Sequence, residues 1–191
     1  FNDTTPAYWE AQKAIKEAEK KGEVVDTKES QILIKKKLSK SKRDSVIRWA
    51  KTYIGTPYVF SGVSRKGIDC SGIIYLAYGS QNIQVPRVSR DMAKRGKKTS
   101  LSNVKKGDLL FFRTHKIRRR INHVGLVISH KKGQIRFLHA TSSRGVIVSS
   151  LSEKYWKKRV LAPSCLLYFI GLNKKLKNVL HHSLFFDVPF E

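Results

Sequence analysis

A cysteine and two histidines are the side chains in this sequence best suited to catalysis. Cys70 stands in the run of residues 69–72 (Asp-Cys-Ser-Gly), directly before the apolar residues 73–77, which predict a helix. A thiol in the first helical turn lies near the positive end of the helix dipole and near unpaired backbone N–H groups, which favour the thiolate. His123 and His139 follow in strand-like stretches. The set predicts nucleophilic catalysis by a thiol, with a histidine as its base.

The two histidines are predicted to meet in a β-hairpin. A turn at residues 131–133 (Lys-Lys-Gly) would place His123 and His139 opposite each other on neighbouring strands. One imidazole can then accept the proton of Cys70, while the other hydrogen-bonds its far ring nitrogen and fixes its tautomer. With histidine instead of a carboxylate as third member, we expect a lower pKa for the base than in an aspartate-backed triad.

Strand alternation assigns a face of the hairpin to each residue. It groups the two histidines with residues Gly125, Val127, Ile135 and Phe137 on one face, and it places Val124, Leu126 and Ile128 on the other. A register slip of one residue would separate the histidines, so their meeting depends on the register.

The elements that must position these residues are predicted as helices followed by strands. The expected helices cover residues 5–22, 41–54, 70–79, 89–96 with Ser89 as N-cap, and one or two turns within 152–158. A linker or basic arm is expected at 23–40 and a loop at 56–67. The expected strands cover 109–112, 124–128, 135–140 and 146–148, with a final strand at 165–170. This order favours an α+β fold in which helices pack on a central antiparallel sheet.

Length and composition predict one catalytic domain with extensions. The 191 residues suffice for one ordinary core. We therefore divide the chain into a helical and basic extension (1–40), a catalytic domain (41–170) and an apolar tail (171–191).

The formal net charge of +25 predicts partners that are polyanions or anionic surfaces. Nucleic acid is disfavoured, because aromatic residues are not interleaved with the basic ones in a recognisable motif.

The two cysteines, Cys70 and Cys165, are not expected to pair, since a disulfide would consume the nucleophile. Closely spaced ligand pairs are lacking, so neither a metal nor a cofactor is expected. No apolar run is long enough to span a bilayer, and the start at Phe1 fits an exported form whose signal segment has been removed.

Six short motifs occur in order along the chain. They are Gly55-Thr56-Pro57-Tyr58, Asp69-Cys70-Ser71-Gly72, Pro86-Arg87-Val88-Ser89, the residues 107–112 (GDLLFF), the residues 123–128 (HVGLVI) and Phe137-Leu138-His139-Ala140. Together they resemble the NlpC/p60 family of cell-wall cysteine peptidases over about residues 43–168. The resemblance implies a papain-like α+β fold and cleavage of peptidoglycan stem peptides, most often at the bond between γ-D-glutamate and the diamino acid.

The resemblance also implies roles for individual residues. It makes Cys70 the nucleophile, His123 the base and later the acid, and His139 the orienting residue. Tyr58 resembles the tyrosine beside the nucleophile, whose hydroxyl could stabilise an oxyanion together with the Cys70 N–H. Three further residues resemble positions that line the substrate cleft: Asp69, which could hold a free amino terminus, Ser71, and Arg87, which could hold a carboxylate.

Two features depart from the family pattern. Phe60-Ser61 stands where many relatives have an aromatic residue followed by glycine, and residues 116–120 form an unusually basic insert before His123. The insert could bind anionic wall polymer or form a solvated loop. About 40 residues precede the catalytic region, which is short for a separate wall-targeting barrel.

The leading hypothesis is a monomeric peptidoglycan hydrolase of the bacterial cell envelope or a secreted one, which needs no cofactor. One alternative is a papain-like acyltransferase or amidase that acts on lipid or another isopeptide, with the apolar tail at a membrane surface. The other is a cationic wall-binding module without catalysis.

Overall fold

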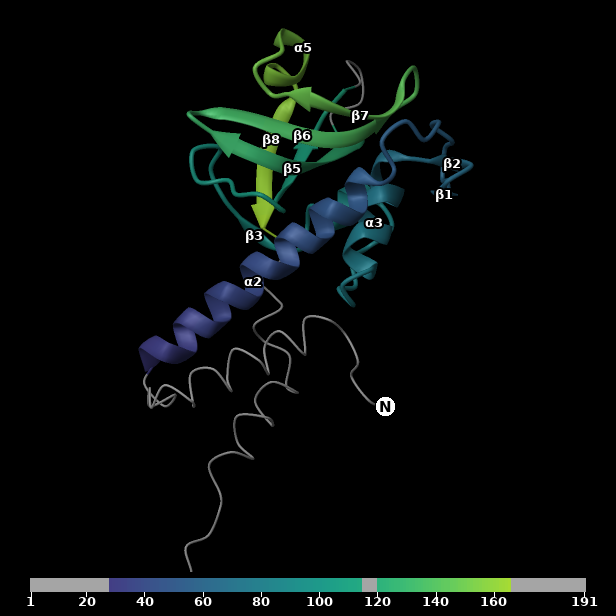
Figure 1. Cartoon of the computed structure of the whole chain (residues 1–191). Coiled ribbons are helices and arrows are strands. Elements are labelled where there is room, and N and C mark those ends of the chain that lie inside the picture. The colour runs from purple at the N-terminus through teal and green to yellow at the C-terminus, as the bar shows by residue number, and fades with distance from the viewer. Residues whose placement is uncertain (1–27, 115–119, 166–191) are drawn as a thin grey trace, which may run out of the picture.

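An antiparallel sheet with strand order β3-β8-β4-β5-β6-β7 organises residues 28–114 and 120–165, the part of the chain that this computed structural model describes (Figure 1). The helices are α2 (Lys28–Lys51), α3 (Cys70–Gly79), α4 (Ser89–Met92) and α5 (Lys154–Lys157). The sheet strands are β3 (Lys97–Lys98), β4 (Leu109–Phe112), β5 (His123–Lys131), β6 (Gln134–Thr141), β7 (Gly145–Ser150) and β8 (Val160–Cys165). A small hairpin of β1 (Val63–Ser64) and β2 (Gly67–Ile68) lies before α3. The helices and the antiparallel sheet confirm the predicted α+β class.

The predicted strands β4 to β7 are confirmed, whereas the final strand is misplaced in the prediction. β8 ends at Cys165, so it occupies 160–165 instead of 165–170, and residues 166–170 lie outside the described part. It lies between β3 and β4, because β4 is buried along its whole length and needs a partner on each side. The predicted strand does not extend over Pro163, and proline cannot donate a hydrogen bond to a neighbouring strand. In the structure the β4–β8 register shifts close to this residue.

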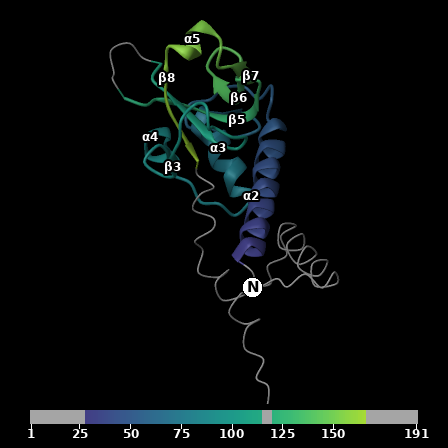
Figure 2. The same cartoon turned by 90° about the vertical axis from the view of Figure 1, so that its left-hand side faces the viewer.

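Helix α2 is longer than predicted. It runs without a break from Lys28 to Lys51, so the capping pattern at residues 41–44 does not start a helix, and residues 28–40 are not a non-helical linker. No glycine or proline interrupts this stretch, and its many Lys residues, together with Leu33, Leu38 and two Arg residues, favour helix. Near its C-terminus α2 packs beside α3, while its other end extends past the sheet (Figures 1 and 2).

Smaller predictions fail or cannot be judged. α4 begins at Ser89 with Val88 as its N-cap and ends at Met92, so Ser89 is not the cap and the helix stops well before Gly96. The loop predicted at 56–67 contains the β1–β2 hairpin. The predicted helix at 5–22, the tail at 171–191 and most of the basic insert lie outside the described residues. None of the described helices is long and apolar enough to cross a bilayer.

Each face of the sheet covers its own hydrophobic core, as the predicted alternation requires. Val124 and Leu126 of β5 pack against Ile73 and Ile74 of α3. On the opposite face, Val127 joins a cluster whose other buried members are Val104, Leu110, Phe112, Ile135, Phe137, Leu151 and Trp156. Neighbouring residues of β5 therefore pack into different cores, so the strand is buried on both faces next to His123.

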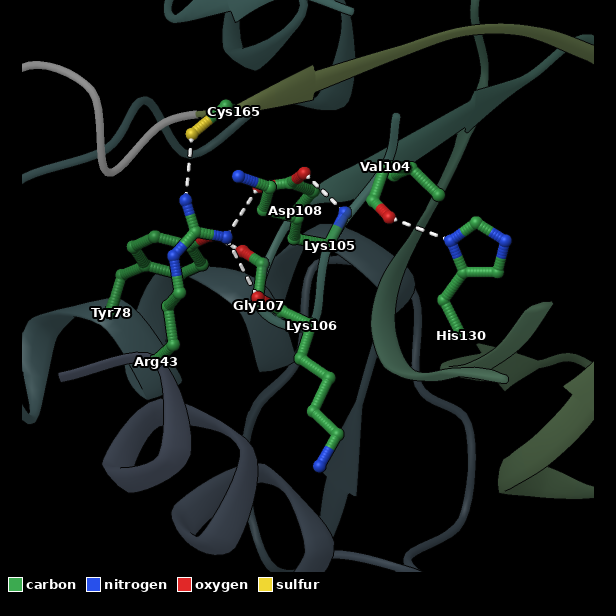
Figure 3. Close-up of polar contacts among 9 residues, drawn as sticks. All are labelled: Arg43, Tyr78, Val104, Lys105, Lys106, Gly107, Asp108, His130 and Cys165. Carbon is green, nitrogen blue, oxygen red and sulfur yellow. Dashed lines mark hydrogen bonds and ion pairs between the residues drawn. The ribbon is translucent and has the colours of Figure 1, made fainter. Parts of the chain in front are cut away.

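A polar cluster fastens α2 to the sheet (Figure 3). Arg43 Nη1 donates to Asp108 Oδ1 and to the carbonyl oxygen of Lys106, both at 2.8 Å, and Arg43 Nη2 donates to Cys165 Sγ at 3.0 Å. The Tyr78 hydroxyl of α3 donates to the carbonyl of the residue before Asp108. Cys165 is therefore half-buried and in polar contact with Arg43. It is a free thiol, as is Cys70.

Candidate active site

Cys70 is the first residue of α3, as predicted. Asp69 is the N-cap in an extended conformation (φ −97°), and its Oδ1 accepts a hydrogen bond from the Gly72 N–H at 2.6 Å. Gly72 is required because a Cβ there would lie 2.3 Å from the carbonyl oxygen of Gly62 in the preceding loop. The close approach packs this loop against the first turn of α3, and it leaves Cys70 only 7% exposed.

Burial of the Cys70 thiol opposes the thiolate that the helix start was expected to favour. Burial raises its pKa to about 11, whereas backbone hydrogen bonds from Val124, Ser71 and Cys70 itself lower that pKa, as predicted for a helix start. Desolvation outweighs these N–H groups because the sulfur has little contact with solvent. The bond from Val124 places the sulfur at the beginning of β5, beside His123.

His123 and His139 touch, which confirms the predicted meeting. His123 Nε2 lies 3.0 Å from His139 Nδ1, and both side chains are buried. Their predicted direct pairing is wrong. The hairpin turn falls at residues 132–133, both with positive φ, and the β5–β6 register shifts between Val127 and Ser129.

The observed register pairs the two histidines diagonally. Leu126 lies opposite Leu138, so Gly125 lies opposite His139 and His123 is two residues further along the same face. Imidazole rings are long enough to bridge this diagonal. Glycine is favoured at position 125 for a separate reason, since a Cβ there would lie 2.5 Å from Cδ2 of Phe137.

Both histidines are neutral at neutral pH. Burial lowers the pKa of His123 well below 6.5, and the nearby charge of Asp69 raises it in part. Burial also lowers the pKa of His139, and the charges of His123 and Arg144 lower it further. The pKa of His123 is thus lowered mainly by desolvation, whereas the prediction attributed a low pKa to the lack of a carboxylate partner.

Sequence reasoning missed two residues that hold this pair. Ser149 of β7 is buried, and its Oγ lies 3.0 Å from His139 Nε2. Trp156 of α5 stacks on the His123 ring at 5.3 Å and meets the His139 ring edge-on at 4.7 Å. The predicted strand ended at residue 148, one position short of Ser149, and nothing in the sequence showed that α5 folds back over the histidines.

Arg87 is already bound to a carboxylate. Its Nη1 and Nη2 donate to the two oxygens of Asp69 at 2.9 and 2.8 Å, and Nη1 also donates to Ser71 Oγ at 2.8 Å. Burial raises the pKa of Asp69, but the hydrogen bonds from Arg87 and the Gly72 N–H outweigh it and lower the pKa overall. Arg87 therefore fixes the N-cap of α3, and its contact with a substrate carboxylate stays a prediction.

Tyr58 lies beside the nucleophile, as predicted. Burial raises the pKa of its hydroxyl, and so do electrostatic interactions with Cys70 and Asp69, while Arg87 lowers it. A group that is affected by all three side chains must be close to them. The backbone of Tyr58 pairs with Ile68, just before the N-cap.

The structure thus brings together all seven residues proposed from the sequence. Within residues 28–114 and 120–165 it forms no hydrogen bond between Cys70 Sγ and His123, a contact that often tightens when substrate binds. In the same residues no group of three or more His, Cys, Asp or Glu side chains is placed to hold a metal ion.

Comparison with known families agrees with this geometry. The model of the NlpC/P60 family matches residues 55–164, more than half of the chain and all of the site described above. The chain belongs to the NlpC/P60 family. Its α+β architecture is the papain-like fold of NlpC/P60 domains.

Relatives of this NlpC/P60 domain carry different activities in their names. It is 42% identical over 106 residues to the Escherichia coli K12 murein DD-endopeptidase MepS/murein LD-carboxypeptidase, covering 55% of this chain and 53% of that protein. It is 32% identical over 124 residues to the Bacillus subtilis γ-D-glutamyl-L-lysine dipeptidyl-peptidase, covering 64% and 40%. The chain thus spans about half the length, or less, of these relatives.

The fold is also that of solved NlpC/P60 structures. An NlpC/P60 family protein from Bacillus cereus ATCC 10987 superposes with a TM-score of 0.60 at 27% identity, covering 65% of this chain and 40% of that one. The similarity supports the assignment of the helices and the sheet.

Proposed function

We propose that this protein is a cysteine peptidase that hydrolyses peptidoglycan stem peptides. The observation that carries the proposal is a buried histidine pair at the start of β5, next to a thiol at the N-terminus of α3. Cys70 is the nucleophile, His123 the base and His139 the residue that orients it. The named activities of its NlpC/P60 relatives supply the substrate class.

The reaction begins from a neutral pair. The Cys70 proton moves to His123 Nδ1, the ring nitrogen that does not contact His139, as the sulfur attacks the amide carbonyl carbon. The oxyanion that forms accepts hydrogen bonds from the Cys70 N–H and the Tyr58 hydroxyl. The C–N bond then breaks, and the leaving amine takes the proton from His123. This leaves a thioester on Cys70.

Water completes the cycle. It gives a proton to His123 while its oxygen attacks the thioester carbonyl, and the sulfur leaves and recovers that proton. Because the thiol and the imidazole are both neutral at rest, the ion pair exists only while substrate is being attacked. The low pKa of His123 makes it a good acid toward the leaving amine.

For the scissile bond we propose the link between γ-D-glutamate and the diamino acid. The Bacillus subtilis relative is named for such a bond, whereas the Escherichia coli relative is named for others. Asp69 Oδ2 accepts one hydrogen bond, from Arg87, while Oδ1 accepts three. Oδ2 is therefore the oxygen with capacity left for a free amino terminus, with Ser71 beside it.

We place the protein in the cell envelope or outside the cell, acting as a monomer on anionic wall material. Its net charge of +25 fits such material, and its relatives are named for murein. Contact with a membrane surface through the C-terminal tail remains a hypothesis about residues outside the described part.

The test is mass spectrometry of defined stem peptides and cross-linked dimers after incubation with the protein. Wild type and Cys165→Ser, the matched control at the other thiol, should release the same fragments, and Cys70→Ala should release none. The fragment masses identify the bond. Intact peptides with binding to wall sacculi would favour the wall-binding module, and transfer of the acyl group to an added amine or lipid would favour an acyltransferase.

A further inference from the structure

We infer that Ser149 is a positioning residue of the active site, which accepts a hydrogen bond from the Nε2–H of His139 and so completes a one-way relay from Cys70. The inference rests on the proposed role of His123 as base. It adds a fourth member to the predicted set of cysteine and two histidines.

The three relay side chains lie on a diagonal across three neighbouring strands. His123 is on β5, His139 on β6 and Ser149 on β7, where Ile147 lies opposite His139 and Ser149 opposite Phe137. His123 Nε2 is 3.0 Å from His139 Nδ1, and His139 Nε2 is 3.0 Å from Ser149 Oγ. Both nitrogens of His139 are thereby engaged. Neither contact can be replaced by water, because His139 has no exposed surface and Ser149 is 4% exposed.

Two arrangements of protons satisfy both contacts. In the first, His123 Nε2–H donates to His139 Nδ1, and His139 Nε2–H donates to Ser149 Oγ. In the second, Ser149 Oγ–H donates to His139 Nε2, and His139 Nδ1–H donates to His123 Nε2. The second arrangement leaves the proton of neutral His123 on Nδ1, where it cannot accept one from Cys70. Only the first arrangement makes His123 a base.

The surroundings of the sulfur favour the first arrangement. Backbone N–H groups, including that of Val124, already point at the Cys70 sulfur. An Nδ1–H of His123 would add another donor there, whereas the protonated thiol needs an acceptor. A bare Nδ1 on His123 would supply that acceptor when the two groups approach each other on substrate binding, and it requires the proton of His123 to be on Nε2.

Once His123 carries the proton taken from the thiol, only the first arrangement of protons on His139 is possible. Both ring nitrogens of an imidazolium are donors, so His139 must accept at Nδ1 and hold its own proton on Nε2. Ser149 is the hydrogen-bond partner of that nitrogen in the described residues. Removing it would leave a buried N–H unpaired in the charged state.

Charges near the relay act in the same direction. Asp69 supports a proton on His123, and the Arg144 cation opposes a positive charge on His139. His139 therefore passes on hydrogen-bond polarisation while it stays neutral. A neutral hydroxyl acceptor suits this role, and a carboxylate would instead draw charge onto His139.

The test compares Ser149→Ala with Ser149→Thr, which keeps the oxygen, and with Ser150→Ala. Ser150 is the next residue of β7, and its Oγ contacts Ser152, so its variant is the matched control. The first readout is ¹⁵N NMR of the imidazoles, which needs no substrate. We expect the Nε2–H tautomer of His139 in wild type, and an added Nδ1–H population in Ser149→Ala.

The second readout is the pH dependence of kcat and KM on a cleaved stem peptide. Ser149→Ala should lower kcat about 10-fold, or about 1.4 kcal/mol, with KM unchanged. Its acidic limb should move to lower pH, because the imidazolium loses support. Ser149→Thr and Ser150→Ala should match wild type.

Several results would overturn the inference. They are an Nδ1–H tautomer of His139 in wild type, or a Ser149→Ala variant with unchanged tautomers, kcat and acidic limb. If Ser149→Ala does not fold, Ser149→Cys replaces it, because the thiol is a weak acceptor of similar size. Tautomers and kinetics of Ser149→Cys that equal those of wild type would then count against the role of Ser149. If neither wild type nor any variant cleaves a peptide, the proposed function fails. The NMR result still decides which nitrogen of His139 carries its proton, and so tests the inference about Ser149.

Discussion

The resting state of the Cys70 thiol gives the sharpest prediction. Burial raises its pKa to about 11, from an ordinary value of 9.0, and the neighbouring imidazole is neutral. We expect that the free protein reacts slowly with iodoacetamide near neutral pH, and that the rate climbs with pH. An enzyme with a preformed thiolate–imidazolium pair would behave differently, since its thiolate persists down to low pH.

The magnitude follows from the thiolate fraction. At pH 7 a thiol with a pKa of about 11 is ionised in roughly one molecule in 10⁴, against roughly one in 10² for the ordinary value of 9.0. Alkylation of Cys70 should therefore be about 100-fold slower than that of an ordinary thiol, and it should rise about tenfold per pH unit between about pH 7 and 10. Its low exposure slows the reaction equally at every pH, so the slope is the diagnostic quantity.

The assay follows the mass of intact Cys165→Ser protein, in which Cys70 is the remaining thiol, during reaction at a series of pH values. His123→Ala in the same background is the second protein. We expect its profile to keep the same slope, because a neutral imidazole contributes no charge to the resting thiol. Two results together would refute the neutral resting pair. They are fast alkylation of the Cys165→Ser protein at a rate independent of pH between about 5 and 9, and a rate that becomes pH-dependent when His123→Ala is added.

Three further substitutions test the structural reasoning. Gly125→Ala should lower the free energy of unfolding by about 1–3 kcal/mol in urea titration, because the new Cβ would lie 2.5 Å from the Phe137 ring; no loss of stability would contradict this packing. Ser61→Gly should raise it by about 0.5–1 kcal/mol, since Ser61 has a φ of 61° that glycine adopts freely, and a decrease would argue against that backbone. The carboxylate of Asp69, whose pKa is lowered, should stabilise the protein above its ordinary pKa of 3.8 and lose this effect as pH falls below it. Asp69→Asn, which cannot form the ion pair with Arg87, should thus be less stable than wild type near neutral pH by a margin that shrinks in acid, and a constant margin would contradict the linkage.

Local sequence patterns predicted much of the fold. The alternation in residues 123–128 and 135–140 is a property of each strand, and both strands formed with the predicted faces. Likewise, Asp69 caps the helix that begins at Cys70, because a side-chain oxygen next to the first N–H groups needs no distant partner.

Predictions of helix and strand boundaries were less successful where two sequence patterns favoured different structures. The pattern at residues 41–44 resembles a helix start, but helix propensity on both sides of it is high, so α2 continues through. The strand β8 contains a proline, and its place beside β4 is decided by the burial that β4 requires. Both outcomes depend on residues outside the local window.

The sequence by itself determined the candidate catalytic set, a thiol at a helix start and two histidines on strands of one hairpin, and the order of motifs typical of an NlpC/P60 domain. These features follow from residue type and short-range periodicity. The tertiary structure alone decided the register that makes the histidine contact diagonal, the burial that keeps the Cys70 thiol protonated, and the approach of Ser149 and Trp156. The physical reason is that desolvation and cross-strand contacts arise only when distant segments pack together, and no local pattern encodes how closely they will meet.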